Sequence, residues 1–87
     1  MFKKRRGIRL SYNKQGLIYF ICINYKDMPT SIQHKIKSLC DEIGKEYANE
    51  LFLVLTTEKS IRSVSIDRCI SESLLYSLRK KFYERWK

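Results

Sequence analysis

The chain has few glycines, one histidine and half as many acidic as basic residues. Its three glycines form no phosphate-binding pattern of the kind that holds a nucleotide. His34 has no nucleophile at a recognisable spacing, and the adjacent Asp41 and Glu42 point in different directions on a helix. A chain of 87 residues builds one modest core and no deep cleft beside it. We therefore expect a non-enzyme that needs no cofactor.

Long hydrophobic runs are also missing. The longest, residues 17–23, has seven residues, whereas a helix needs about 20 to span a bilayer. The run also lies too far along the chain to be a secretory signal. We therefore expect a cytoplasmic protein with no membrane partner.

Cysteine is sparse and its spacing is uninformative. An odd number of cysteines, Cys22, Cys40 and Cys69, is no disulfide framework. A zinc site would have to combine all three with His34, and the sequence contains no close Cys-x-x-Cys or His pair. We expect buried thiols and no metal.

Positive charge is abundant and unevenly distributed. Eighteen Lys and Arg against nine Asp and Glu give a net charge of +9 at pH 7. Residues 1–40 and 59–87 carry the excess of basic residues, whereas residues 41–58 carry five acidic residues and one basic residue. Basic ends favour a polyanion, such as nucleic acid or an anionic membrane surface. We expect the acidic middle to lie away from that partner.

The pattern of residues 8–28 predicts a β-hairpin. Ile8, Leu10 and Tyr12 alternate with polar residues, and the run LIYFICINY is rich in β-branched and aromatic side chains. Residues 13–16 read as the turn between the two strands. A lone hairpin is marginal in water, so one face must pack on the helices. We expect the C-terminal helix to bury Phe20; left exposed beside Arg9, it would stack on a base or form a dimer contact.

Residues 30–57 predict two helices. Pro29 ends the extended segment, and Thr30-x-x-Gln33 is typical of a capping box that opens the first helix. Gly44 is expected to end it. Residues 45–56 form the second helix, which is apolar nearly all round and therefore belongs at the centre.

Residues 59–78, KSIRSVSIDRCISESLLYSL, are typical of two short helices that cross tightly. In this segment Val64 is the apolar anchor, Ser65 is the small residue and Cys69 is the compact residue of the turn. Ser71 is the capping serine, and Leu75 and Leu78 face inward. This pattern resembles the helix-turn-helix family of DNA-binding domains, and more loosely the small regulators of phages and mobile elements of Gram-positive bacteria. The family most often has glycine at the position of Cys69, so this cysteine is asked to adopt a left-handed backbone.

The resemblance implies that the second helix, residues 72–86, enters the major groove of DNA. Candidate base-reading residues are Ser71, Glu72, Ser73 and Ser77. Candidate phosphate-binding residues are Lys59, Arg62, Tyr76, Arg79 and Lys80, together with Lys3, Lys4, Arg5 and Arg6 of a basic arm.

These expectations combine into one α+β domain over residues 1–87. A basic arm (1–7) precedes the β-hairpin (8–28), two helices (30–57) and the helix-turn-helix (59–87). The expected function is transcriptional or mobile-element regulation through double-stranded DNA, with a homodimer formed through the hairpin edge.

Two other functions stay open. One is a phage- or mobile-element-encoded inhibitor that binds a protein partner. The other is a basic RNA-binding module in which Tyr19, Phe20 and Tyr25 of the hairpin stack on unpaired bases.

Overall fold

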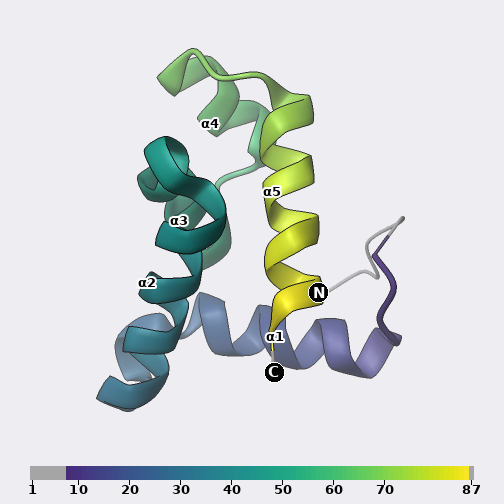
Figure 1. Cartoon of the computed structure of the whole chain (residues 1–87), viewed down its shortest axis with the longest axis vertical. Helices are drawn as coiled ribbons and strands as arrows, with labels where there is room; N and C mark the ends of the chain where they lie inside the picture. The colour runs from purple at the N-terminus through teal and green to yellow at the C-terminus, as the bar shows by residue number, and fades with distance from the viewer. Residues whose placement is uncertain (1–7, 87) are drawn as a thin grey trace.

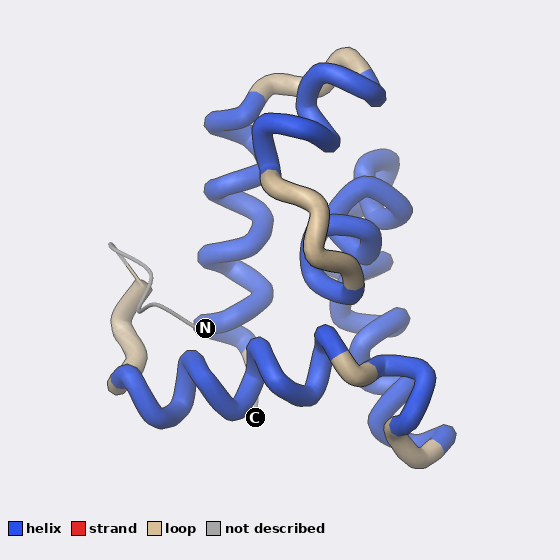
Figure 2. The backbone as a smooth tube through the Cα atoms, turned by 180° about the vertical axis from the view of Figure 1, so that it is seen from behind, coloured by secondary structure: helices blue, strands red, loops and turns tan. Residues whose placement is uncertain are grey.

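The structure, a computed structural model, describes residues 8–86, and within that range it contains helices and loops but no strand (Figure 2). The elements in chain order are α1 (Tyr12–Ile23), the 3-10 helix η1 (Tyr25–Asp27), α2 (Thr30–Gly44), the 3-10 helix η2 (Lys45–Tyr47), α3 (Ala48–Thr56), α4 (Ile61–Arg68) and α5 (Glu72–Arg85). The fold is therefore all-helical over the described residues, and the expected α+β class is wrong.

The error lies in residues 8–28, where α1 replaces the predicted hairpin. Ser11 opens the helix, because its side chain accepts a hydrogen bond from the Lys14 N–H (3.2 Å). The buried positions on α1 are three and four residues apart, as in a helix: Gln15, Ile18 and Cys22. Residues 13–16, expected as a turn, lie within the first turns of this helix. Without strands there is no hairpin edge for a dimer.

A buried glutamine fixes the chain that leads into α1. Gln15 is 0% exposed, and its amide donates to the Leu10 carbonyl at 3.0 Å. This bond satisfies a polar group that would be costly to bury unpaired. It holds the segment before α1 against the helix, where Ile8 joins the core.

The core divides into two clusters that α5 connects. The main core consists of Ile8, Ile18, Cys22, Ile36, Cys40, Leu51, Leu55, Leu78, Phe82 and Tyr83. The small core consists of Val54, Ile61, Val64 and Leu75. In Figure 1, α1 crosses the C-terminal end of α5, and α4 lies at the opposite end. The hydrogen bond from the Arg9 N–H to the Glu84 carboxylate (3.1 Å) ties the chain before α1 to that C-terminal end.

The junction between α2 and α3 also differs from expectation. The expected capping box is absent, because Pro29 is the N-cap of α2 and makes no side-chain capping bond. The Gln33 amide instead donates to the Tyr25 carbonyl (2.9 Å), which anchors η1. Gly44 is the last α2 residue and keeps right-handed helical backbone, whereas Lys45 takes a positive φ of 51° with ψ −117°. The backbone of Lys45 therefore ends α2, whereas the sequence predicted that Gly44 would end it.

No helix within residues 8–86 is both long enough and apolar enough to cross a membrane.

The backbone of Lys45 gives a stability prediction. Only glycine adopts this φ without steric cost, so Lys45→Gly should raise the free energy of unfolding by about 1 kcal/mol. Lys45→Ala keeps the Cβ atom and should change it by less than about 0.5 kcal/mol. Urea denaturation of both variants measures the difference. A loss of stability in Lys45→Gly would contradict the assigned break.

Candidate nucleic-acid interface

Helices α4 and α5 are joined by a three-residue connection, residues 69–71. Ser60 opens α4 by accepting from the Ser63 N–H (3.0 Å), and Ser71 opens α5 by accepting from the Leu74 N–H (3.4 Å). Between them Cys69 has φ 55° and ψ 46°, the left-handed conformation. The capping role of Ser71 and the backbone shape of Cys69 are both as predicted.

Ser65 closes this connection from the α4 side. The Ile70 N–H donates to the Ser65 carbonyl (3.1 Å), and the Ser65 hydroxyl donates back to the Ile70 carbonyl. The sequence indicated only that a small residue was needed here. Its hydroxyl also satisfies a carbonyl in the turn, which a glycine or alanine could not do.

The small core holds the two helices together. Val64 and Leu75 are fully buried, and Ile70 packs against them. Leu78 is also buried but belongs to the main core, one turn further along α5. Trp86 is half-buried at the end of α5, where the Lys35 Nζ atom lies 4.1 Å from its ring centroid.

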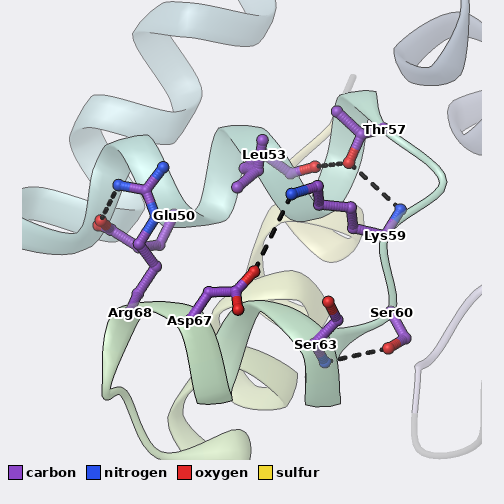
Figure 3. A network of polar contacts seen from close by, with 8 residues as sticks. All are labelled: Glu50, Leu53, Thr57, Lys59, Ser60, Ser63, Asp67 and Arg68. Carbon is purple, nitrogen blue, oxygen red and sulfur yellow. Dashed lines mark hydrogen bonds and ion pairs between the residues drawn. The ribbon is translucent and has the colours of Figure 1, made fainter.

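Polar contacts tie α4 to α3 (Figure 3). Arg68 Nη1 lies 3.6 Å from Glu50 Oε2, across the two helices. The Arg68 side chain is half exposed, and its guanidinium pairs with a carboxylate of the acidic segment. The acidic segment, expected to lie away from the partner, therefore contacts the α4–α5 pair at one point, where Glu50 offsets the positive charge of Arg68.

The loop before α4 is also braced. Thr57 Oγ1 donates to the Leu53 carbonyl (2.6 Å) and accepts from the Lys59 N–H (3.3 Å). Lys59 Nζ lies 4.0 Å from Asp67 Oδ2 at the other end of α4 (Figure 3). Both side chains of this pair are more than half exposed, so it contributes little to stability and leaves Lys59 able to exchange partners.

The four candidate base-reading residues, Ser71, Glu72, Ser73 and Ser77, are all exposed. Ser73 and Ser77 are four residues apart, so they lie on the same side of α5, and Lys80 continues that side after three more residues. Ser71 differs from them, since its hydroxyl oxygen already accepts from the Leu74 N–H, which leaves its proton and one lone pair for another contact.

Three of the candidate phosphate-binding residues line one hollow. Lys59, Tyr76 and Arg79 border a cavity of about 320 Å³ between the end of α3, the following loop and α5, and the acidic residue Glu58 lines it as well. Arg79 also lies over the Tyr76 ring, with 5.2 Å between its Cζ atom and the ring centroid. Tyr19 of α1 completes the wall, a contribution that no local sequence signal could reveal. We refer to this cavity as the basic hollow.

The other phosphate candidates are not part of the basic hollow. Arg62 and Lys80 are exposed on α4 and α5. Lys3, Lys4, Arg5 and Arg6, the expected basic arm, lie outside the described residues.

The aromatic residues of the expected RNA platform are dispersed. Tyr19 borders the basic hollow, whereas Tyr25 packs edge-on against Phe52 with 4.9 Å between ring centroids. Phe20, expected to be buried by the C-terminal helix, is exposed on α1. The three rings therefore lie in different surroundings, and the RNA-binding alternative stays a prediction.

The cysteines fall into two chemical classes. Burial raises the pKa of the Cys22 and Cys40 thiols to about 12, and the proximity of Cys40 adds to the effect on Cys22. Cys69 is exposed, contrary to the expectation that all three thiols would be buried. His34 is exposed on α2, and residues 8–86 contain no cluster of three metal-binding side chains.

No protein-family model matches this chain, and neither a curated protein nor a solved structure matches it significantly.

The thiol environments predict selective labelling. At pH 8 a thiol with a pKa near 12 is ionised in roughly one molecule in ten thousand, so Cys22 and Cys40 should react only after unfolding. A disulfide reagent that releases a chromophore should therefore show one fast equivalent in the native protein and three in denaturant. Cys69→Ser should abolish the fast phase. More than one fast equivalent in the native protein would contradict the burial of the other two thiols.

Proposed function

We propose that this protein binds double-stranded DNA through α4 and α5 and acts as a small transcriptional or mobile-element regulator in the cytoplasm. The observation that carries the proposal is the division of α5 into two sides. Leu75, Leu78 and Phe82 anchor one side in both cores, whereas the polar side bearing Ser73 and Ser77 is exposed. A rigidly held helix with an exposed polar side has the form required to enter a major groove.

The side chains on that surface suit groove contact. Ser73 and Ser77 are short, so the α5 backbone can approach the bases closely, and a hydroxyl can donate to or accept from a base edge. Glu72 is exposed at the start of α5, where its carboxylate can accept from a cytosine amino group. Serines discriminate among bases only moderately, so part of the specificity is assigned to the shape of the duplex.

The basic residues around this surface supply phosphate contacts. Lys59 and Arg79 border the basic hollow on one side of α5, and Arg62 and Lys80 are exposed nearby in the same helix pair. Contacts of this kind fix the register of a protein on the duplex and carry little sequence information. A protein partner with an acidic surface could use the same basic residues, and the experiment below distinguishes the two.

The electrostatic contribution can be measured by salt titration. Duplex affinity, followed by fluorescence anisotropy, should fall steeply as salt rises, because each phosphate contact releases counterions. Arg79→Ala and Lys80→Ala should each make the slope of log K against log [salt] shallower by about one unit.

Lys26→Ala serves as the matched control, since it removes the same charge from an exposed residue of η1 and should leave the slope nearly unchanged. Salt-independent binding, or an equal loss of slope in the control, would contradict the assigned phosphate contacts. A stoichiometric complex with a protein that survives nuclease treatment, without duplex affinity, would favour the inhibitor function.

A further inference from the structure

The basic hollow has a buried floor beneath an exposed, polar rim. Four of its lining residues are almost fully buried and belong to the two cores: Val54, Leu55, Ile61 and Tyr83. Its volume of about 320 Å³ lies at the lower end of the range of roughly 300–1,000 Å³ that is usual for small-molecule sites. A double helix is too wide to enter such a space, so the proposed DNA contacts use the rim and leave the interior unassigned.

The rim carries two cations and one carboxylate. Glu58 and Lys59 are exposed and Arg79 is partly exposed, so these three side chains sum to one positive charge. The Arg79 Cζ atom lies 5.2 Å from the centroid of the Tyr76 ring, and this contact orients the planar guanidinium. A guanidinium donates two parallel hydrogen bonds to a compact oxyanion, so the rim suits a small anionic group.

Two groups at the start of α4 add donors to the rim. The Ser60 hydroxyl oxygen accepts from the Ser63 N–H (3.0 Å; Figure 3), which leaves its proton and one lone pair for another contact. Lys59 Nζ lies 4.0 Å from Asp67 Oδ2, and both side chains are more than half exposed. Such a pair is weak, so the ammonium can exchange this carboxylate for a phosphate monoester, which carries nearly two negative charges at pH 7.

Tyrosine rings from two helices form much of the wall. Tyr19 of α1 borders the basic hollow together with Tyr76 and Tyr83 of α5. The Tyr76 side chain is half exposed, so part of its ring is accessible to a ligand. Planar heterocycles pack well against such rings, whichever base they carry. The basic hollow therefore combines contacts for a phosphate with contacts for a flat ring.

We propose that the basic hollow binds one nucleoside monophosphate. Lys59, Ser60 and Arg79 bind its phosphate at the rim, and its base packs between the rings of Tyr19 and Tyr76. The volume admits a single nucleotide and no second one. Glu58 weakens the binding through like-charge repulsion of the phosphate.

The same site then regulates the proposed DNA binding. Lys59 and Arg79 are also the cations that are assigned to DNA phosphates, so a nucleotide and a duplex compete for them. Since this competition is reciprocal, a bound nucleotide releases the duplex. The competition rests on the proposed function, whereas nucleotide binding by the chain alone does not.

Titration of adenosine monophosphate into the isotope-labelled full chain, followed by amide NMR signals, tests the site. Signals of residues 57–61 and 76–83 should shift and saturate, and Arg79→Ala should weaken binding by about tenfold. Glu58→Gln should strengthen it by about threefold, because the repulsion is removed. A gain of affinity cannot result from a damaged fold.

Lys26→Ala is the matched control, because it removes a positive charge from η1, outside the basic hollow, and should leave the affinity nearly unchanged. Adenosine and inorganic phosphate should each bind about tenfold more weakly than adenosine monophosphate, since each lacks one of the two contacts. Inorganic phosphate that binds as tightly as the nucleotide would reveal an unspecific anion site and overturn the proposal. Absent shifts around the hollow, or an equal loss in Lys26→Ala, would overturn it too.

Fluorescence anisotropy of a labelled duplex at constant ionic strength tests the competition. Adenosine monophosphate should displace the duplex, and simultaneous binding of both would overturn the regulatory role. Nucleotide binding by a chain without duplex affinity would confirm the site and contradict the proposed function. Duplex affinity without nucleotide binding would leave the proposed function intact and overturn the site.

Discussion

The burial of one side of α5 is the constraint on which the other features depend. Leu75 is sealed in the small core, and Phe82 is sealed in the main core nearly two turns later. Each such side chain contributes about 1.5–3 kcal/mol when it is removed from water, so rotation of α5 about its axis would expose several of them at once. The orientation of Ser73, Ser77 and Lys80 toward solvent follows from this packing.

Local chemistry explains why the sequence predicted the α4–α5 connection well. A serine before a helix satisfies free N–H groups wherever the helix lies in the fold, and this applies to the predicted cap Ser71. Ser60 opens α4 in the same way, although the sequence was not used to predict it. Val64 and Leu75 must meet in the small core although few residues separate them in the sequence. The chain between them must therefore turn sharply, and the left-handed conformation of Cys69 makes that turn. These signals depend on neighbours within a few residues, so a single sequence contains them.

The same reasoning failed for α1 because its apolar residues nearly surround it. The apolar residues of a run such as LIYFICINY fit the period of a strand, two, and that of a helix, 3.6, almost equally well. Asn13 and Gly16 are residue types common in turns, so the segment between them was predicted as one. The decisive signals were the spacing of Gln15, Ile18 and Cys22 and the presence of Ser11 before them. Reading Gln15 as a core residue required knowledge that the Leu10 carbonyl needed a donor, which only the folded chain provides.

The candidate site shows the same division between local and tertiary information. The exposure of Ser73 and Ser77 could be predicted from helical spacing, whereas the basic hollow could not, because Tyr19 reaches it from α1. The pairing of Arg68 with Glu50 and the exposure of Phe20 likewise depend on how α1 and α3 pack. The sequence therefore predicted which polar and basic residues are exposed on α4 and α5 better than it predicted how neighbouring helices shape the surface around them.

The central claim, that the exposed side of α5 reads duplex DNA, is tested most directly by selection from a pool of random duplexes. The account predicts an enriched motif for the natural chain, and a relaxed motif with nearly unchanged non-specific affinity for Ser73→Ala or Ser77→Ala, since base contacts carry the specificity. A selection that enriches no motif with the natural chain, or the same motif with both serine variants, would contradict it.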